Sequence, residues 1–428
     1  MTTTFLTTTG QADAGHPDPT FNGGRQVDVY PWAGVAMATA IAPLADESML
    51  VATFNLSDPG QDQFYVTKVL PGGTLATDFG NHEQAPGERF LKDTFGTPRV
   101  LPQLHALDDG SFYVLSLGEG ALHLARYTAA GLPGAAFEST GSYQRTIALG
   151  ALDGGTGFHV QGELISIFDG QTFYIGVTAE LASGDTVASV TALSLEGVPV
   201  PGFNGSGQLL VHPPRDVSRA MQLRGLDVHR DANNLGKPVV AVGWAEAPGE
   251  ALFIARFDVN GTIDAAFAER GFAWVAPDRL LHMQVVVDPS GTVKLCGTVA
   301  NEDEDTFEKV FAFTVSGQID TAFKGGTALL ESFPNDAFNP GNQGKVIFRS
   351  SEQPDGYRLT CTKFSSANGC VTARLLESGV KDEAFGEAGR AWIRHLPLGS
   401  QAGQTMKLHP GTGKILVARH IYTFRYNA

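Results

Sequence analysis

The sequence predicts an all-β fold: a seven-bladed β-propeller with four antiparallel strands per blade, closed by pairing of the N- and C-terminal strands. Three observations predict it. One motif recurs seven times at intervals of about 60 residues, four short strand patterns surround each copy, and the first repeat lacks a strand that the end of the chain supplies. We expect residues 15–428 to form a single β-propeller domain of seven repeats, and residues 1–14 to be a flexible N-terminal tail.

A phenylalanine anchors the motif, and a glycine stands six residues before it in every copy. The phenylalanines are Phe21, Phe79, Phe137, Phe203, Phe267, Phe323 and Phe385, and the glycines are Gly15, Gly73, Gly131, Gly197, Gly261, Gly317 and Gly379. Because only 51 of the 428 residues are glycine, seven glycines in register do not arise by chance. The glycine predicts a turn with positive φ, and the phenylalanine predicts a core wedge between blades.

Two further positions of the motif carry charge. Aspartate stands three residues before the phenylalanine in four copies and is expected to accept hydrogen bonds from the amides of the glycine turn. A basic residue stands eleven residues before the phenylalanine in four copies and is expected to bridge neighbouring blades or to extend along them. The aspartates are Asp18, Asp264, Asp320 and Asp382; the basic residues are Lys68, Arg126, Arg256 and Arg374, with Ala192 and Ala312 as exceptions.

Four short strand patterns surround each motif. An alternating stretch such as Arg25–Tyr30 follows the motif, and an apolar stretch such as Ala36–Pro43 comes next. A turn such as Asp288–Gly291 then leads to a β-rich run such as Phe112–Leu115, and the strand with the basic residue comes last. Short strands joined by Asp-Gly-type turns are typical of hairpins. Four antiparallel strands are the unit of a propeller blade, which buries its faces against its neighbours.

The two ends of the chain predict how the ring closes. The first copy lacks the strand that should precede Gly15, and the last residues supply one, in which Arg425-Tyr426 matches Arg126-Tyr127. The last blade should therefore take three strands from residues 404–428 and its outermost strand from about residues 25–31. An open superhelix is the alternative, although such an array needs a capping repeat at each end.

The later copies carry the motif most fully. Ala255-Arg256-Phe257 is followed by Asn-Gly-Thr-Ile-Asp-Ala-Ala-Phe at residues 260–267, and Gly379 leads through Asp382 to Phe385-Gly386. In these residues the chain resembles the delta-60 repeat family of bacterial proteins, and the resemblance extends over nearly the whole chain. It implies a propeller-like fold. Because the family's biochemical role is mostly unassigned, the resemblance implies no catalytic residues.

Composition narrows the classes of partner. The chain has 30 basic and 45 acidic residues and a formal net charge of −15, without a cluster of Lys or Arg. A protein that binds a polyanion such as nucleic acid or an anionic membrane profits from a basic face, so the charge argues against both as partners. The N-terminus has no signal-peptide pattern, and no apolar run reaches the roughly 20 residues of a membrane span. We expect a cytoplasmic monomer, with leaderless export as an alternative.

A few short patterns partly resemble known chemical motifs. Gly411-Thr412-Gly413-Lys414 resembles part of a phosphate loop, but Leu408 stands at the upstream glycine position and Ile415 at the Mg²⁺ ligand. A hairpin turn is therefore expected. The acidic run Asn301–Asp305 lacks the glycine and spacing of a calcium loop and is expected to be a solvated turn. The sequence contains no zinc or nucleophile-elbow pattern, so no catalytic residue, metal ligand or cofactor is assigned.

The cysteines and tryptophans favour structural roles. The chain has three cysteines, Cys296, Cys361 and Cys370, an odd number that does not form a disulfide framework. Cys361 and Cys370 fall on consecutive expected strands and could face each other, but reduced thiols are the expectation for a cytosolic chain. The tryptophans do not recur in register, which favours packing between blades over a set of sugar-binding platforms. They are Trp32, Trp244, Trp274 and Trp392.

These observations favour a non-catalytic binding or scaffold propeller, which contacts a protein or a small ligand through loops of one face. The longest copies carry Gly/Asn/Pro-rich additions at residues 150–162, 230–237 and 332–343, and we expect partner contacts there. Two other classes stay open. A glycan-binding lectin-like module would need an aromatic and polar set in each blade, and a hydrolase or lyase would place its site at the central channel.

Overall fold

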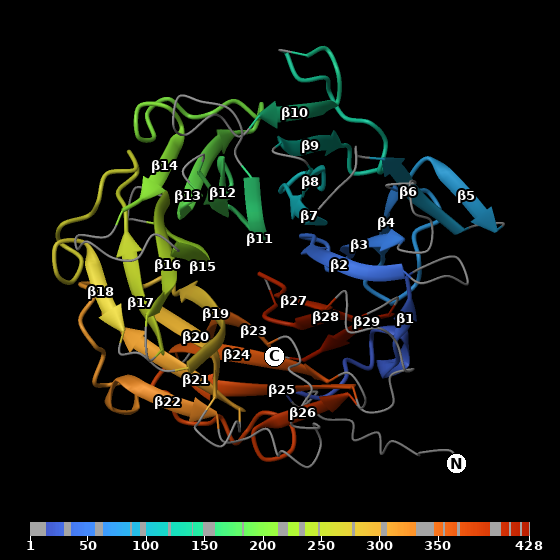
Figure 1. Cartoon of the computed structure of the whole chain (residues 1–428). Helices are drawn as coiled ribbons and strands as arrows, with labels where there is room; N and C mark the ends of the chain where they lie inside the picture. Colours follow the sequence, from blue (N-terminus) through green and yellow to red (C-terminus); the bar gives the residue numbers. More distant parts are fainter. Residues whose placement is uncertain are drawn as a thin grey trace.

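The chain folds into a closed seven-bladed β-propeller (Figure 1). The structure is a computed structural model. It describes residues 14–29, 36–55, 63–85, 88–94, 100–118, 121–138, 140–148, 159–181, 184–212, 221–230, 236–246, 249–275, 279–300, 306–330, 346–353, 356–365, 369–393, 404–410, 412–419 and 422–427.

Each blade is an antiparallel sheet whose first strand lies nearest the axis and whose later strands follow it outwards. Blade 1 contains β2 (Ala36–Pro43), β3 (Met49–Asn55), β4 (Gln63–Val69) and β6 (Glu88–Thr94), with β5 (His82–Ala85) paired to the outer side of β6. Blade 2 contains β7 (Val100–Ala106), β8 (Phe112–Leu117), β9 (Ala121–Tyr127) and β10 (Gln144–Ala148). Blade 3 contains β11 (His159–Phe168), β12 (Thr172–Glu180), β13 (Thr186–Ser194) and β14 (Gln208–Val211).

The remaining blades follow the same order. Blade 4 contains β15 (Met221–Arg230), β16 (Gly236–Glu246), β17 (Gly249–Arg256) and β18 (Phe272–Val275), and blade 5 contains β19 (Arg279–Val287), β20 (Val293–Ala300), β21 (Thr306–Phe313) and β22 (Thr327–Leu330). Blade 6 contains β23 (Val346–Gln353), β24 (Gly356–Ser365), β25 (Gly369–Leu376) and β26 (Arg390–Ile393). Blade 7 contains β27 (Gln404–Leu408), β28 (Ile415–Arg419), β29 (Tyr422–Tyr426) and β1 (Val27–Asp28).

Strand pairing between the chain ends closes the ring, as predicted. Val27 and Asp28 of β1 lie opposite Thr423 and Tyr422 of β29 in an antiparallel pair. The Gly15 amide donates a hydrogen bond of 2.8 Å to the Asn427 carbonyl. The first strands of successive blades contact one another around the axis, including β27 with β2 (Figure 1). The alternative of an open superhelix is therefore wrong.

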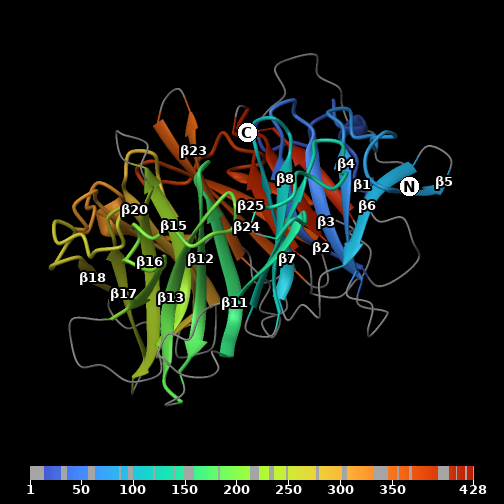
Figure 2. The same cartoon turned by 90° about the horizontal axis from the view of Figure 1, so that it is seen from above.

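Because the strands alternate in direction, the propeller has two distinct faces. The turns between first and second strands, and those between third and fourth strands, lie on one face, which we call the motif face because it carries the motif glycines. The loops between second and third strands and the connections between blades lie on the other, which we call the connection face. Figure 2 shows the strands running between these two faces.

The motif phenylalanines and glycines join neighbouring blades. All seven phenylalanines are fully buried, and all seven glycines have a positive φ, as predicted. The structure adds a second reason for the glycine. A Cβ at Gly317 would lie 2.7 Å from the Ala268 amide and 2.8 Å from the Phe267 ring of the preceding blade. The same contact recurs between Phe385 and Gly15 across the ring closure.

This packing predicts that replacement of a motif glycine by alanine destabilises the protein more than the same replacement at a glycine with free space around it. Gly317 and Gly325 have φ of +77° and +78°, but a Cβ at Gly325 would meet nothing within 4 Å. Replacement of Gly325 by alanine should cost about 1–2 kcal/mol for the left-handed backbone alone. Gly317→Ala should cost about 1–3 kcal/mol more because of the clash with blade 4. Equal losses in chemical denaturation would show that the contact between blades does not require glycine.

The charged motif residues form a stack on the phenylalanine. Arg256 Nε donates a 2.9 Å hydrogen bond to Asp264 Oδ2, and its guanidinium lies 4.7 Å from the centre of the Phe267 ring. Arg256 also donates to the Val315 carbonyl of the next blade at 2.6 Å, which confirms the predicted bridge between blades. The same arrangement joins Arg374, Asp382 and Phe385, and Arg425, Asp18 and Phe21.

The aspartate caps a different turn from the one expected. Asp264 Oδ1 accepts a hydrogen bond of 3.1 Å from the Ala266 amide, and Asp320 Oδ1 accepts one of 3.1 Å from the Ala322 amide. These amides lie in the turn that leads into the phenylalanine, not in the glycine turn. The aspartate therefore stabilises the turn that positions the phenylalanine. The second carboxylate oxygen of the aspartate remains available to accept a hydrogen bond from arginine.

The cysteines do not pair across their strands. Cys361 lies opposite Ala373 and Cys370 lies opposite Phe364, so the suggestion that these two cysteines face each other is wrong. All three cysteines are buried free thiols. Burial raises the pKa of the Cys296 thiol above its usual range, which keeps it protonated.

Candidate functional site

Exposed apolar side chains gather on the motif face. In the part of the chain that the structure describes, five large apolar side chains are exposed, and all five stand within two residues of a motif glycine. They are Leu132, Val198, Val315, Ile319 and Val380, with exposures of 46%, 41%, 43%, 61% and 50%. Single exposed apolar residues are normal on any protein. Their restriction to one kind of turn on one face is not scatter.

The repeat motif holds these turns rigidly from below. Arg256 binds the carbonyl of Val315 itself, and Arg126 of blade 2 donates a 2.9 Å hydrogen bond to the Leu195 carbonyl in the turn that carries Val198. The Ala268 amide donates at 2.6 Å to the Ser316 carbonyl in the turn of Ile319. The exposed tips are therefore fixed before any partner arrives, which lowers the entropy lost on binding.

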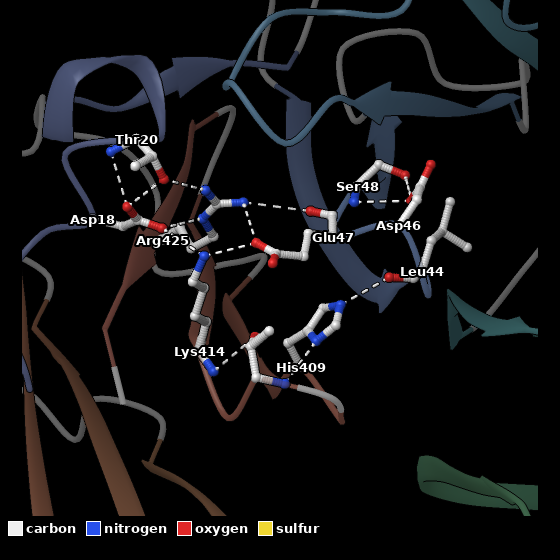
Figure 3. A network of polar contacts seen from close by, with 10 residues as sticks. Asp18, Thr20, Leu44, Asp46, Glu47, Ser48, His409, Lys414 and Arg425 are labelled. Carbon is white, nitrogen blue, oxygen red and sulfur yellow. Dashed lines mark hydrogen bonds and ion pairs between the residues drawn. The ribbon is translucent and has the colours of Figure 1, made fainter.

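A cavity of about 560 Å³ opens on the same face where the ring closes. It lies between blade 7 and blade 1 and is lined by Thr20, Ala45, Asp46, Glu47, Pro71, Gly72 and Arg425. Figure 3 shows how its charged groups converge from the two ends of the chain. Arg425 Nε donates to Asp18 Oδ2 at 2.7 Å and its Nη2 donates to Thr20 Oγ1 at 2.9 Å.

Lys414 completes this network, which we call the closure network. Its Nζ donates at 2.7 Å to Glu47 Oε2 and lies 3.2 Å from Asp18 Oδ2 (Figure 3). The hydrogen bond from Lys414, with its charge, lowers the pKa of Glu47. The predicted hairpin turn between β27 and β28 is confirmed, and its lysine joins the ends of the chain. Because these charges neutralise one another, the cavity favours no ion of one sign.

Polar side chains also line the axis, on the first strands of the blades. Asp227 Oδ2 of β15 accepts a 2.8 Å hydrogen bond from the Val287 amide of β19, and Gln284 Oε1 of β19 accepts one of 2.9 Å from the Phe348 amide of β23. β15 and β19 thus each satisfy a backbone amide on the open edge of the next first strand. Gln103 does the same for the Leu164 carbonyl at 2.7 Å.

A serine and a histidine meet in this lining. His105 Nε2 lies 2.7 Å from Ser166 Oγ, and Ser166 also donates to Gln103 Oε1. Burial lowers the pKa of His105 to about 3, with a further contribution from the charge of Lys407, so the ring is neutral at physiological pH. His105 and Ser166 are only 8% and 6% exposed. The pair joins blade 2 to blade 3 and offers a substrate little access.

Three charged residues share the axis from different blades. Asp227 stands on β15, Arg349 on β23 and Lys407 on β27, all first strands of their blades, and each residue is partly accessible. Burial, followed by the charge of Arg349, lowers the pKa of Lys407 to about 7, although Asp227 opposes the shift. In the described segments, no group of three or more His, Cys, Asp or Glu side chains has the arrangement of a metal site.

The predicted contact loops fall largely outside the described residues. Residues 150–158, 231–235 and 332–343 are not described, nor is the acidic run at 301–305. The described ends of the first and third additions lie on the connection face, whereas those of the second lie on the motif face. The expectation that all three additions share one face is therefore wrong. The second addition joins the first and second strands of a blade, whereas the other two join successive blades, and these two kinds of connection lie on opposite faces.

Trp274 is the tryptophan whose side chain lies within the described residues. Trp274 is partly buried and lies 5.6 Å from Phe253, between ring centres, on the neighbouring strand of its own blade. It therefore packs within its blade. Trp32 and the side chains of Trp244 and Trp392 lie outside the described residues.

The described helical segments are only η1 (Asn22–Gly24) and η2 (Lys324–Gly326), so none has the length of a membrane span.

The chain is similar to several solved structures at low sequence identity. No family model and no curated protein matches the sequence. Drosophila Semaphorin 2a is 10% identical, with 97% of this chain and 77% of that chain covered and a TM-score of 0.49. The chain is also similar to a PL25 polysaccharide lyase, an ulvan lyase, with 10% identity, 94% of this chain and 96% of that chain covered and a TM-score of 0.46. It is similar to an α-L-arabinofuranosidase from Fusarium graminearum as well, with 10% identity, 83% of this chain and 98% of that chain covered and a TM-score of 0.43. This likeness extends to the fold alone.

Proposed function

We propose that this chain is a binding or scaffold propeller that recognises a protein partner through its motif face. The observation that carries the proposal is the restriction of the exposed large apolar side chains, among described residues, to the motif turns. Val315, Ile319 and Val380 come from the adjacent blades 5 and 6, and Leu132 and Val198 come from the adjacent blades 2 and 3. Apolar groups on a rigid surface gain binding free energy when a partner removes them from water.

The chemistry of these turns supports a protein partner over a glycan. The exposed groups are aliphatic, whereas stacking on sugar rings requires aromatic faces, and Trp274 is packed within its blade. The cavity between blade 7 and blade 1 is lined by charges that are already paired, so it indicates no particular ligand. We further propose, on the motif alone, that the repeats are of the delta-60 type.

Site-specific photo-crosslinking tests the proposal in the cells that naturally produce the protein. A photoreactive amino acid at position 319 or 380 should give the same discrete crosslinked polypeptide. The matched control carries it at Gln222, which is exposed at the connection-face end of β15. Crosslinks from position 222 alone, or no polypeptide adduct from either motif-face position, would contradict a protein-binding motif face.

A further inference from the structure

The axial charges form a set that the closed ring does not balance. Asp227 holds both carboxylate oxygens in hydrogen bonds to backbone amides, Oδ1 with Val228 and Oδ2 with Val287, each at 2.8 Å. Arg349 donates to the carbonyl of its own neighbour Phe348 at 2.7 Å. Within the described residues, Lys407 donates no hydrogen bond, and neither cation has a carboxylate within 4 Å. Two cations therefore share one acid whose oxygens are already engaged.

The three side chains lie near enough to act on one another. The charges of Arg349 and Lys407 both stabilise the ionised form of Asp227, and the charge of Lys407 reaches His105 on the opposite side of blade 1. Their strands belong to the ring of first strands around the axis, where β23 contacts β27 and β19 lies between β15 and β23. The net charge of this group is one positive unit when both cations are protonated.

An unbalanced cation inside a protein is costly, because the interior solvates charge poorly. One monovalent anion would neutralise the group. A guanidinium fork and an ammonium together match the oxygens of a carboxylate or a phosphate. The side chains of Arg349 and Lys407 are partly accessible, so a small ion can reach them without unfolding a blade.

We propose that the propeller axis binds a small oxyanion between Arg349 and Lys407. The site is distinct from the motif face and does not depend on the proposed protein partner. Asp227 limits its total charge and so disfavours highly charged anions. The ligand class is a monocarboxylate or inorganic phosphate, which share the oxygens that both cations recognise.

Titration calorimetry on the full chain tests the site, with inorganic phosphate and acetate as separate probes at constant ionic strength. At least one probe should bind the natural chain, and Lys407→Met should weaken it at least tenfold. The control Lys381→Met removes a partly exposed lysine of the motif face, which is paired with Glu383 at 2.8 Å, and should bind like the natural chain. Tighter phosphate than acetate binding would assign a phosphate ligand, and the reverse a carboxylate.

A second readout separates a binding lysine from a structural one. Without added anion, Lys407→Met should be at least as stable as the natural chain, because it removes an unbalanced cation. Binding should weaken as the pH rises above about 7, since Lys407 then loses its proton; Arg349, Asp227 and His105 are the groups that act electrostatically with it. No binding of either probe at millimolar concentration, unchanged binding by Lys407→Met, or lower stability of that variant would overturn the proposal.

Discussion

Deletion of residues 1–29 should abolish cooperative unfolding of the propeller. The deletion removes the outermost strand of blade 7, the buried Phe21, and Asp18, the partner of Arg425. Loss of a buried phenylalanine costs about 3–5 kcal/mol, and breaking the buried Asp18–Arg425 ion pair by removing one partner costs about 3–5 kcal/mol more. Their sum is comparable to the whole stability of an ordinary domain, about 5–15 kcal/mol. Calorimetry and near-ultraviolet circular dichroism would detect the loss.

A circular permutant supplies the control for this deletion. When Ala428 is joined directly to Ala14, Arg425 precedes Asp18 by eight residues, which is the interval from Arg256 to Asp264. A chain that begins at residue 33 and ends at residue 32 through this junction should therefore fold with nearly the natural stability. Cooperative unfolding of the deleted chain at the natural temperature would show that the terminal strand does not hold the ring.

The fold could be predicted because its determinants are local and repeated. Arg256, Gly261, Asp264 and Phe267 lie within one short segment. Contacts of the same kind between blades recur in other copies, such as Arg126 with the Leu195 carbonyl and Gly15 against Phe385. The same register predicted the pairing of β1 with β29, although Val27 and Thr423 stand at opposite ends of the chain. Repetition thus supplied the long-range information that one copy lacks.

The candidate sites could be predicted only in part. Ile319 and Val380 stand beside motif glycines, so a search of the turns for apolar residues would have found them. Asp227, Arg349 and Lys407 follow no repeat, because they occur on three of seven first strands and act on one another electrostatically only when the ring closes. Their association depends on which side of each strand faces the axis, and no interval in the sequence encodes it.

Asp18→Ala should destabilise the protein by about 3 kcal/mol, because it removes the buried carboxylate that Arg425 and Lys414 share. Glu47, whose Oε2 lies 3.7 Å from Arg425 Nη1, then remains as the counter-charge. Asp320→Ala should cost only about 1 kcal/mol. Asp320 caps the Ala322 amide in the same way, but Ala312 stands where other copies have a basic strand residue, so no ion pair is lost. Urea unfolding of both variants beside the natural chain measures the difference. Equal losses would mean that the Arg425 ion pair adds nothing to ring closure.

The cost of Asp18→Ala should also depend on pH. Burial alone would raise the pKa of Asp18, but hydrogen bonds from Thr20, the charge of Arg425 and a hydrogen bond from Lys414 outweigh it and hold the pKa below its ordinary value of 3.8. An acid with a depressed pKa stabilises the fold fully above its unfolded pKa, and this stabilisation is lost as the pH falls through the folded pKa. The difference in unfolding free energy between the natural chain and Asp18→Ala should therefore stay constant above about pH 5 and shrink below about pH 4. A difference that persisted unchanged into strong acid would show that the carboxylate acts through packing, not through its charge.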